Sequence, residues 1–161
     1  MRRLVRPLLV LVLGAGLGTT TAAPAAGSRA IVITVRSVTT ASIPSDRAPK
    51  GASKGDRVLL RDRLLNVRKQ FGKPAGAMVG TDEGVLVLTS ATSATFDGVT
   101  TLPGGTILLH GVFREGIGTY SVAGGTGRYA HARGRVEIGN GPSPLNTYRL
   151  TFAAASVPPV I

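Results

Sequence analysis

The sequence contains no cysteine among its 161 residues. This absence excludes disulfide bonds, thiol catalysis and cysteine-ligated zinc, and it excludes a lipid-modified cysteine behind an export signal. Tryptophan is also absent and aromatic residues make up only 4% of the chain, so a surface that stacks on single-stranded nucleic acid is not expected. No segment has the periodicity of an amphipathic helix, which favours an all-β fold.

Acidic residues are scarce as well: 8 stand against 19 lysines and arginines, for a net charge of +11. Without residues 1–25, 16 basic residues remain against the same 8 acidic ones, a net charge of +8. This excess favours anionic partners such as cell-wall polymers or acidic lipid. The alternative is a solvated surface with no specific partner, and we expect no specific binding of nucleic acid.

The N-terminus predicts a cleavable signal peptide over residues 1–25 and therefore a secreted protein. A basic start, Met1 to Arg6, precedes the apolar run Leu8 to Leu13 and the small-residue stretch Ala23-Pro24-Ala25. We place the cut after Ala25, with Ala23 and Ala26 as neighbouring alternatives. The apolar run is shorter than the ~20 residues of a membrane span, so no stable span is expected after cleavage. The alternative is an uncleaved N-terminal anchor.

The remaining chain has the length of one domain. Residues 26–54 should hold a first strand, Ala30 to Val35, and a mobile connection from Thr39 to Lys54. Residues 55–155 should complete a small closed antiparallel β-barrel of about eight strands, and 156–161 should be a tail. Short strand-like segments, most of them alternating, separated by glycine turns indicate this class of fold. They include Arg57–Leu65, Val85–Thr89, Thr106–Phe113, Arg128–Ile138 and Tyr148–Phe152.

Three local predictions bear on the interior. Asp62 falls in phase with the apolar Leu60 and Leu64, so it should lie on the buried face of its strand. Thr81 to Gly84, which contains the adjacent acids Asp82 and Glu83, has the composition of a turn or bulge. The alternation from Arg128 to Ile138 places Tyr129 and His131 on an outer, polar face.

Several motifs resemble the allene oxide cyclase and dirigent-protein barrel superfamily, in particular its secreted bacterial members. They occur in order at Gly55-Asp56, Val79–Gly84, Leu102–Gly105 and Val122–Gly134, within a match from Ile31 to Phe152. The most specific stretch reads Gly-Gly-Thr-Gly-Arg-Tyr-Ala-His-Ala-Arg-Gly. A phosphate-binding loop is a poor alternative, because such loops need a helix or a lysine after the glycines.

The resemblance implies an eight-stranded barrel that is often trimeric and that encloses an apolar pocket. Allene oxide cyclases steer the cyclisation of a fatty-acid epoxide, and dirigent proteins steer the coupling of phenolic radicals, both without a metal or an organic cofactor. We therefore expect no cofactor here. The plant pocket residues do not carry over to positions of this sequence.

The candidate site residues come from the strand patterns. Asp62 and His110 are the candidate catalytic residues, an acid–base pair if their strands face each other. Tyr120 and Tyr148 are candidate ligand-binding hydroxyls. Each has a structural alternative: Asp62 as a solvated or ion-paired group at the barrel mouth, and His110 and the tyrosines as packing residues. Two histidines without a third ligand do not make a metal site.

Two functions follow. The first is a secreted barrel that binds a small apolar or phenolic molecule in its lumen and guides its cyclisation or coupling, as a cofactor-free, isomerase-like activity. An apolar cavity of roughly 300 Å³ or more with Asp62 pointing into it would favour this function. The alternative is a non-enzymatic structural or interaction barrel whose basic surface, Arg57 to Lys73, contacts anionic polymers.

Overall fold

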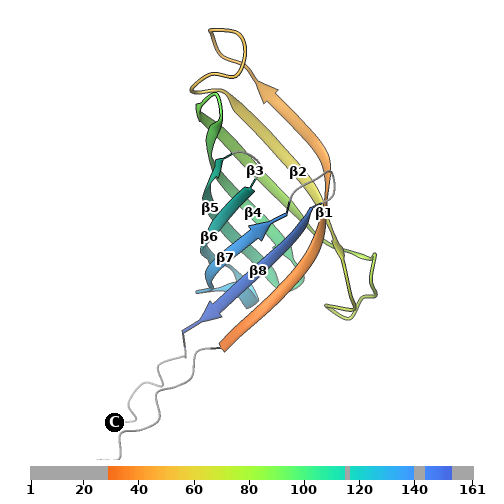
Figure 1. The fold of residues 1–161 in the computed structure, drawn as a ribbon. Coiled ribbons are helices and arrows are strands. Elements are labelled where there is room, and N and C mark those ends of the chain that lie inside the picture. Colours follow the sequence, from red (N-terminus) through yellow and green to blue (C-terminus); the bar gives the residue numbers. More distant parts are fainter. Residues whose placement is uncertain (1–28, 115–116, 140–143, 154–161) are drawn as a thin grey trace, which may run out of the picture.

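Eight antiparallel strands form a closed barrel in the computed structural model of the protein, which describes residues 29–114, 117–139 and 144–153 (Figure 1). Each strand pairs with its neighbour in the sequence, and β8 returns to β1. The predicted closed all-β barrel is thereby confirmed, whereas the predicted signal peptide and the tail lie outside the described residues. The strands are β1 (Arg29–Ser45), β2 (Arg57–Asn66), β3 (Met78–Ser90), β4 (Ser93–Leu102), β5 (Gly105–Arg114), β6 (Ile117–Gly125), β7 (Arg133–Ile138) and β8 (Leu145–Phe152).

The first strand is much longer than predicted. It continues through Ser45, because the β-branched residues Val38, Thr39, Thr40 and Ile43 extend the ladder with β2 beyond a bulge between Thr39 and Ala41. Its first half pairs with β8, from Arg29 opposite Phe152 to Arg36 opposite Leu145, and this pairing closes the barrel. The predicted connection from Thr39 to Lys54 was therefore wrong in its first part.

The connection between β1 and β2 is organised around Asp56, which is buried. Its carboxylate accepts hydrogen bonds from the backbone N–H groups of Arg47 and Ser53, each at 2.8 Å. These backbone hydrogen bonds, first that of Arg47, hold the pKa of Asp56 below its ordinary value. Stability from this group is therefore present at neutral pH and is lost as the pH falls through the lowered pKa.

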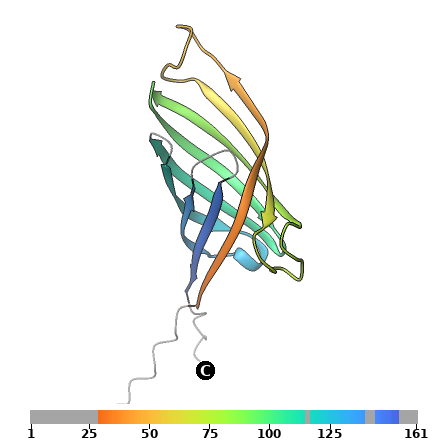
Figure 2. The same ribbon diagram turned by 45° about the vertical axis from the view of Figure 1, so that its right-hand side comes forward.

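One end of the barrel is filled by side chains. The start of β1 and the end of β8 lie side by side there, next to the β2–β3 loop and a 3-10 turn, Gly127–Tyr129 (Figures 1 and 2). Tyr129, Ile107 and Leu64 are fully buried inside this end, and the Tyr129 hydroxyl donates to the carbonyl of Pro103 at 3.2 Å. We call it the closed end, and it gives the barrel its core.

The 3-10 turn corrects a prediction. The strand β7 begins at Arg133, not at Arg128, and Tyr129 faces the interior instead of the solvent. The glycines before it bend the chain inward: Gly127 has a positive φ of 55°, and a Cβ atom there would overlap the carbonyl of Gly104. His131 is exposed, as predicted, but in a turn with a positive φ of 63°. Within the described ranges, no helix is long and apolar enough to cross a membrane.

Candidate functional site

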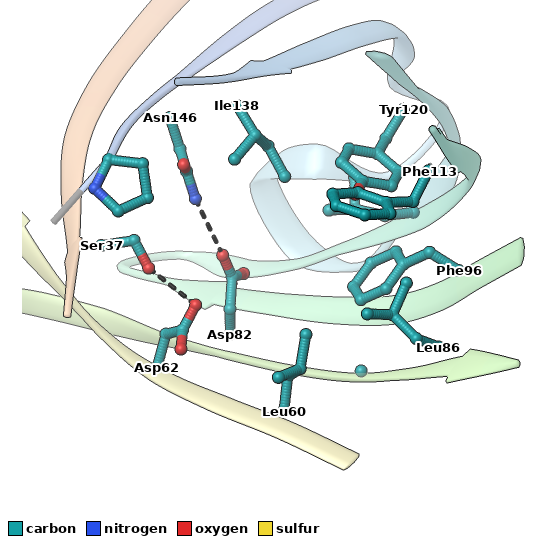
Figure 3. Close-up of a pocket in the computed structure, with 13 residues that line it drawn as sticks. Ser37, Leu60, Asp62, Asp82, Leu86, Phe96, Phe113, Tyr120, Ile138 and Asn146 are labelled. Atoms are coloured by element: carbon teal, nitrogen blue, oxygen red, sulfur yellow. Dashed lines mark hydrogen bonds between the residues drawn. The ribbon is translucent and has the colours of Figure 1, made fainter. Parts of the chain in front are cut away.

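The other end of the barrel is hollow. A cavity of about 160 Å³ lies between β1, β2, β3, β4, β5, β6 and the ends of β7 and β8 that face the mouth. It is bounded by Ser37, Leu60, Asp62, Asp82, Gly84, Leu86, Phe96, Leu109, Phe113, Tyr120, Ile138, Pro144 and Asn146. Figure 3 shows polar side chains gathered on one side of this cavity and aromatic rings on the other.

Two carboxylates from neighbouring strands line the polar side. Asp62 on β2 and Asp82 on β3 are direct partners in the antiparallel register. Both point inward because each occupies the same alternating phase as an apolar cavity residue, Leu60 in β2 and Leu86 in β3. Like charges placed opposite each other in a sheet are destabilising, so this pair is not explained by the stability of the fold.

Each carboxylate is held by a hydrogen bond to one of its oxygens. Ser37 Oγ donates to Oδ2 of Asp62 at 2.7 Å (Figure 3). The hydroxyl of Tyr148 and the amide Nδ2 of Asn146 donate to Oδ2 of Asp82, at 3.0 and 3.4 Å. Since Tyr148 donates to Asp82, Thr100 Oγ1 donates in turn to the Tyr148 hydroxyl, at 3.1 Å. These bonds fix both side chains and leave their Oδ1 atoms for other contacts.

Burial, with a smaller contribution from the negative charge of the neighbouring Asp62, raises the pKa of Asp82 to about 6, against the lowering effect of hydrogen bonds from Thr100 and Tyr148. Burial and the charge of Asp82 also place the pKa of Tyr148 well above its ordinary value. Asp82 can therefore gain or lose a proton near neutral pH, whereas Tyr148 remains a hydrogen-bond donor. A group with this titration is suited to general acid–base catalysis.

The opposite wall is aromatic. The rings of Phe96 and Tyr120 lie 4.9 Å apart between centroids, at an interplanar angle of 58°. Both rings lie over glycines. A Cβ atom at Gly84 of the neighbouring β3, or at Gly98 of the same strand, would overlap the Phe96 ring, and one at Gly111 of β5 would overlap Tyr120. Without side chains at these positions, the rings lie flat against the sheet and leave the cavity open.

Replacing Gly84 by alanine should therefore push the Phe96 ring into the cavity. We expect the free energy of unfolding to fall by about 1–3 kcal/mol, the usual cost of overpacking, as measured by urea denaturation. Adding Phe96→Leu removes the ring atoms that overlap the new methyl group and should restore part of the loss. A Gly84→Ala variant as stable as the original protein would show that the ring is not held against β3.

A second hollow of about 330 Å³ adjoins the cavity and shares Leu86 and Phe113 with it. It lies around the β3–β4 hairpin, where Leu88, Ala91 and Ala94 make its lining mainly apolar. The lumen alone is smaller than the size expected from the sequence. The adjoining hollow supplies apolar space into which a larger ligand could extend.

The structure does not bring the two predicted catalytic residues together. Asp62 lines the cavity, but His110 lies on the outer surface of β5, where its Nδ1 is 2.6 Å from Oδ1 of Asp97. The predicted pairing of His110 with Asp62 was wrong because strand alternation turns His110 outward, opposite to its neighbours Leu109 and Gly111, which are buried. His110 therefore has no part in the cavity.

The two candidate tyrosines have different positions. Tyr120 lines the cavity directly. Tyr148 is fully buried and is not part of the cavity wall. Its hydroxyl donates a hydrogen bond to Oδ2 of Asp82. Tyr148 is thus placed to position Asp82, and it does not line the cavity as a ligand-binding residue would.

Sequence reasoning missed Asp82 and Asn146. Residues 81–84 belong to the continuous strand β3 and are not a turn, so the composition Asp-Glu-Gly was misleading. The signal was the spacing of two residues between Asp82, Gly84 and Leu86, the same signal that identified Asp62. Asn146 similarly precedes the aligned Tyr148 and Leu150 at intervals of two residues, in β8.

A basic groove lies at the closed end. Arg68 and Lys69 of the β2–β3 loop and Arg128 border it, and none of the three has an acidic partner within 4.0 Å among the described residues. Asn66 orders the loop by donating to the carbonyls of Gln70, Lys73 and Pro74. The alternative function, contact with anionic polymers, stays a prediction. Over the described ranges, no three His, Asp or Glu side chains come together as a metal site.

The eight-stranded antiparallel barrel shares its fold with solved structures of a dirigent protein and of cyclase barrels, which confirms the resemblance at the level of fold. No protein-family model matches the chain, and no curated protein matches it. The comparison with known proteins therefore rests on solved structures.

Three solved structures illustrate the similarity. A pyocyanin demethylase aligns with a TM-score of 0.64 and 22% identity, over 74% of this chain and 99% of its own. The Diels–Alderase AbmU from Streptomyces koyangensis has a TM-score of 0.60 and 18% identity, over 81% and 68% of the two chains. The pterocarpan synthase dirigent protein GePTS1 has a TM-score of 0.55 and 15% identity, over 78% and 88%. At these identities the similarity shows the fold alone.

Proposed function

We propose that this protein is secreted, binds a small apolar or phenolic molecule in the hollow end of its barrel, and guides its cyclisation or coupling. The observation that carries the proposal is the carboxylate pair Asp62 and Asp82 in a cavity with an otherwise largely apolar wall. Charged groups are costly in such surroundings, and a few polar groups within an apolar pocket are typical of a ligand site. The similar barrels named above include a Diels–Alderase, an enzyme of ring formation, which supports the reaction class.

The aromatic side and the polar side of the cavity have different roles in this proposal. The rings of Phe96, Phe113 and Tyr120 hold the apolar body of the ligand and exclude water. Asp82 takes a proton from one position of the ligand and returns it at another, with Asp62 as the neighbouring acceptor, so a cyclisation needs no net change in the protein. Most of the acceleration would come from holding the reacting atoms close together.

Binding and turnover can be tested separately. Phenol, a ring of the size that the cavity accommodates, should bind in ligand-observed NMR titrations. Binding should weaken in Gly84→Ala, whose Phe96 ring enters the cavity, and should remain unchanged in Asp97→Asn, an acid on the outer surface. Absence of phenol binding to the original protein would contradict the proposal.

Turnover is tested on small molecules that copurify with the protein in native mass spectrometry. A cyclisation yields a product of the same mass as its substrate. A coupling of two phenolic radicals needs an added one-electron oxidant and yields a product of twice the substrate mass less two hydrogen atoms. We expect Asp82→Asn to lower the rate of this conversion by at least about a hundredfold, the usual contribution of a general acid–base group. An unchanged rate in this variant would remove Asp82 from the mechanism.

A further inference from the structure

Three acceptor oxygens at the polar side of the cavity have no hydrogen-bond donor. They are Oδ1 of Asp62, Oδ1 of Asp82 and Oδ1 of Asn146, all of them buried, and no donor among the described residues reaches them. The orientation of Asn146 is set by its Nδ2, which donates to Asp82 and so leaves the Oδ1 atom as the unpaired one. Buried acceptors without a donor are destabilising, most of all when they are charged, so three around one cavity indicate a missing donor.

The negative charge of the pair also has no counter-ion in the described part of the chain. The described residues that line the cavity include no lysine, arginine or histidine. Arg61 and Arg63 flank Asp62 in β2 but are exposed on the opposite face, and Arg61 instead lies 3.6 Å from Glu83 on the outside of the barrel. The charge excess of the protein as a whole is positive, so this negative cavity is a local exception.

The remaining wall sets the size and character of the rest of the ligand. Leu60, Leu86, Phe96, Phe113 and Tyr120 face the same space (Figure 3). A cavity of about 160 Å³ is close to the volume that, in an engineered apolar cavity of another protein, takes up a benzene ring. One ring with a short polar arm therefore fits between the aromatic side and the acceptors.

We infer that the ligand carries a primary ammonium group on a one-ring apolar body, with the ammonium group on the polar side of the cavity beside Asp62 and Asp82. This inference rests on the proposed function, in that it takes the lumen as the binding site. An ammonium group has three donors and one positive charge, and so it offers hydrogen bonds together with the counter-ion that the carboxylate pair lacks among the described residues. A phenol offers one donor, a quaternary ammonium offers charge without a donor, and a carboxylate would be repelled.

The test is a calorimetric titration of the purified protein with three probes of similar shape at about pH 7.5. Benzylamine carries charge and donors, benzyltrimethylammonium carries charge alone, and benzyl alcohol carries a single neutral donor. We expect benzylamine to bind at least about tenfold more tightly than either of the others, the usual margin for hydrogen bonds to charged groups. Asp62→Asn and Asp82→Asn should each weaken benzylamine about tenfold and leave benzyl alcohol nearly unchanged, whereas Asp97→Asn should change neither.

The outcomes separate this inference from the function on which it rests. Equal affinities for benzylamine and benzyl alcohol would overturn the ammonium ligand and leave the lumen as a binding site. Equal affinities for benzylamine and benzyltrimethylammonium would overturn the role of the N–H donors, and so the choice of a primary ammonium group. Failure of all three probes to bind would count against the proposed function itself. Because the probes are compared on the unmodified protein, a variant that does not fold cannot decide the result.

Discussion

Asp82→Asn should be more stable than the unmodified protein at pH 8, by about 2–3 kcal/mol in the free energy of unfolding. In the folded protein, burial raises the pKa of Asp82 from 3.8 to about 6, so its ionised form is disfavoured relative to the unfolded chain. A shift of this size corresponds to a free energy of that order once the group is ionised. Asparagine resembles the protonated acid in shape and is neutral, so the variant is free of the energetic cost of a buried ionised group. Its Oδ1 can still accept the hydrogen bond from Tyr148.

The pH dependence gives the sign of this effect. Between pH 3.8 and about 6 the folded state binds more protons at Asp82 than the unfolded state does, so stability falls as the pH rises through that window. The difference between Asp82→Asn and the original protein should therefore be near zero at about pH 4 and complete above about pH 7. Urea unfolding at a series of pH values measures it, with Glu83→Gln, an exposed acid on the outer face of the same strand, as the control that should show no such trend.

Two results would contradict this account. A variant that is less stable than the original protein at pH 8 would mean that the carboxylate contributes more through its hydrogen bonds than it loses by burial. A difference that does not change with pH would mean that Asp82 does not titrate with a raised pKa. In either case, proton transfer by Asp82 near neutral pH would no longer be expected.

A stabilising substitution at this position also bears on function. Groups that are unfavourable for the fold and still occupy the interior are typical of binding and catalytic sites, where local rules of stability are broken. Asp82 breaks two such rules, since it is a charged group in an apolar cavity and stands directly opposite a second acid, Asp62. If Asp82→Asn proves more stable but loses the conversion expected under the proposed function, that combination would be the signature of such a site.

The barrel fold could be predicted from the alternation of apolar and polar residues in its strands. The same pattern identified Asp62, one of the two carboxylates in the cavity. Asp62 was found because its strand alternates clearly, so a single acid in the apolar phase stands out. Asp82 was not found because glycines precede and follow it at intervals of two, and Asp-Glu-Gly has the composition of a turn. Those glycines are explained only by the structure, where the ring of Phe96 lies over Gly84 and takes the place of its missing side chain.

Pairings between distant strands could not be predicted. No local pattern in β5 shows that His110 and Asp62 lie on opposite sides of the barrel wall, because the absolute orientation of a strand depends on its neighbours. The hydrogen bonds that hold Asp82 come from β8, 64 and 66 residues further along the chain, and no sequence spacing encodes them. The site is therefore a product of barrel closure, in which β8 returns to β1 and brings Asn146 and Tyr148 beside β3.

Tyr129 shows how a glycine-rich motif can mislead. The alternation of residues 128–138 continues through the 3-10 turn and suggests an outward side chain, but the turn rotates the ring into the core, where it is fully buried. Its backbone carbonyl and Cβ lie so close to Gly125 that a side chain there would overlap them. The Gly-Gly-Thr-Gly-Arg-Tyr motif thus allows the ring of Tyr129 to fill one end of the barrel.

Tyr129→Ala should consequently lower the free energy of unfolding by about 3–5 kcal/mol, the range for removing a fully buried aromatic ring. Tyr129→Phe keeps the ring and loses only the hydrogen bond to Pro103, so its cost should be about 1 kcal/mol. Urea unfolding of both variants measures the two parts. A loss below about 1 kcal/mol in Tyr129→Ala would mean that this ring does not close the barrel. Because Tyr129 lies outside the cavity wall, the folded fraction of Tyr129→Ala should still bind phenol, which distinguishes the core at the closed end from the site at the hollow end.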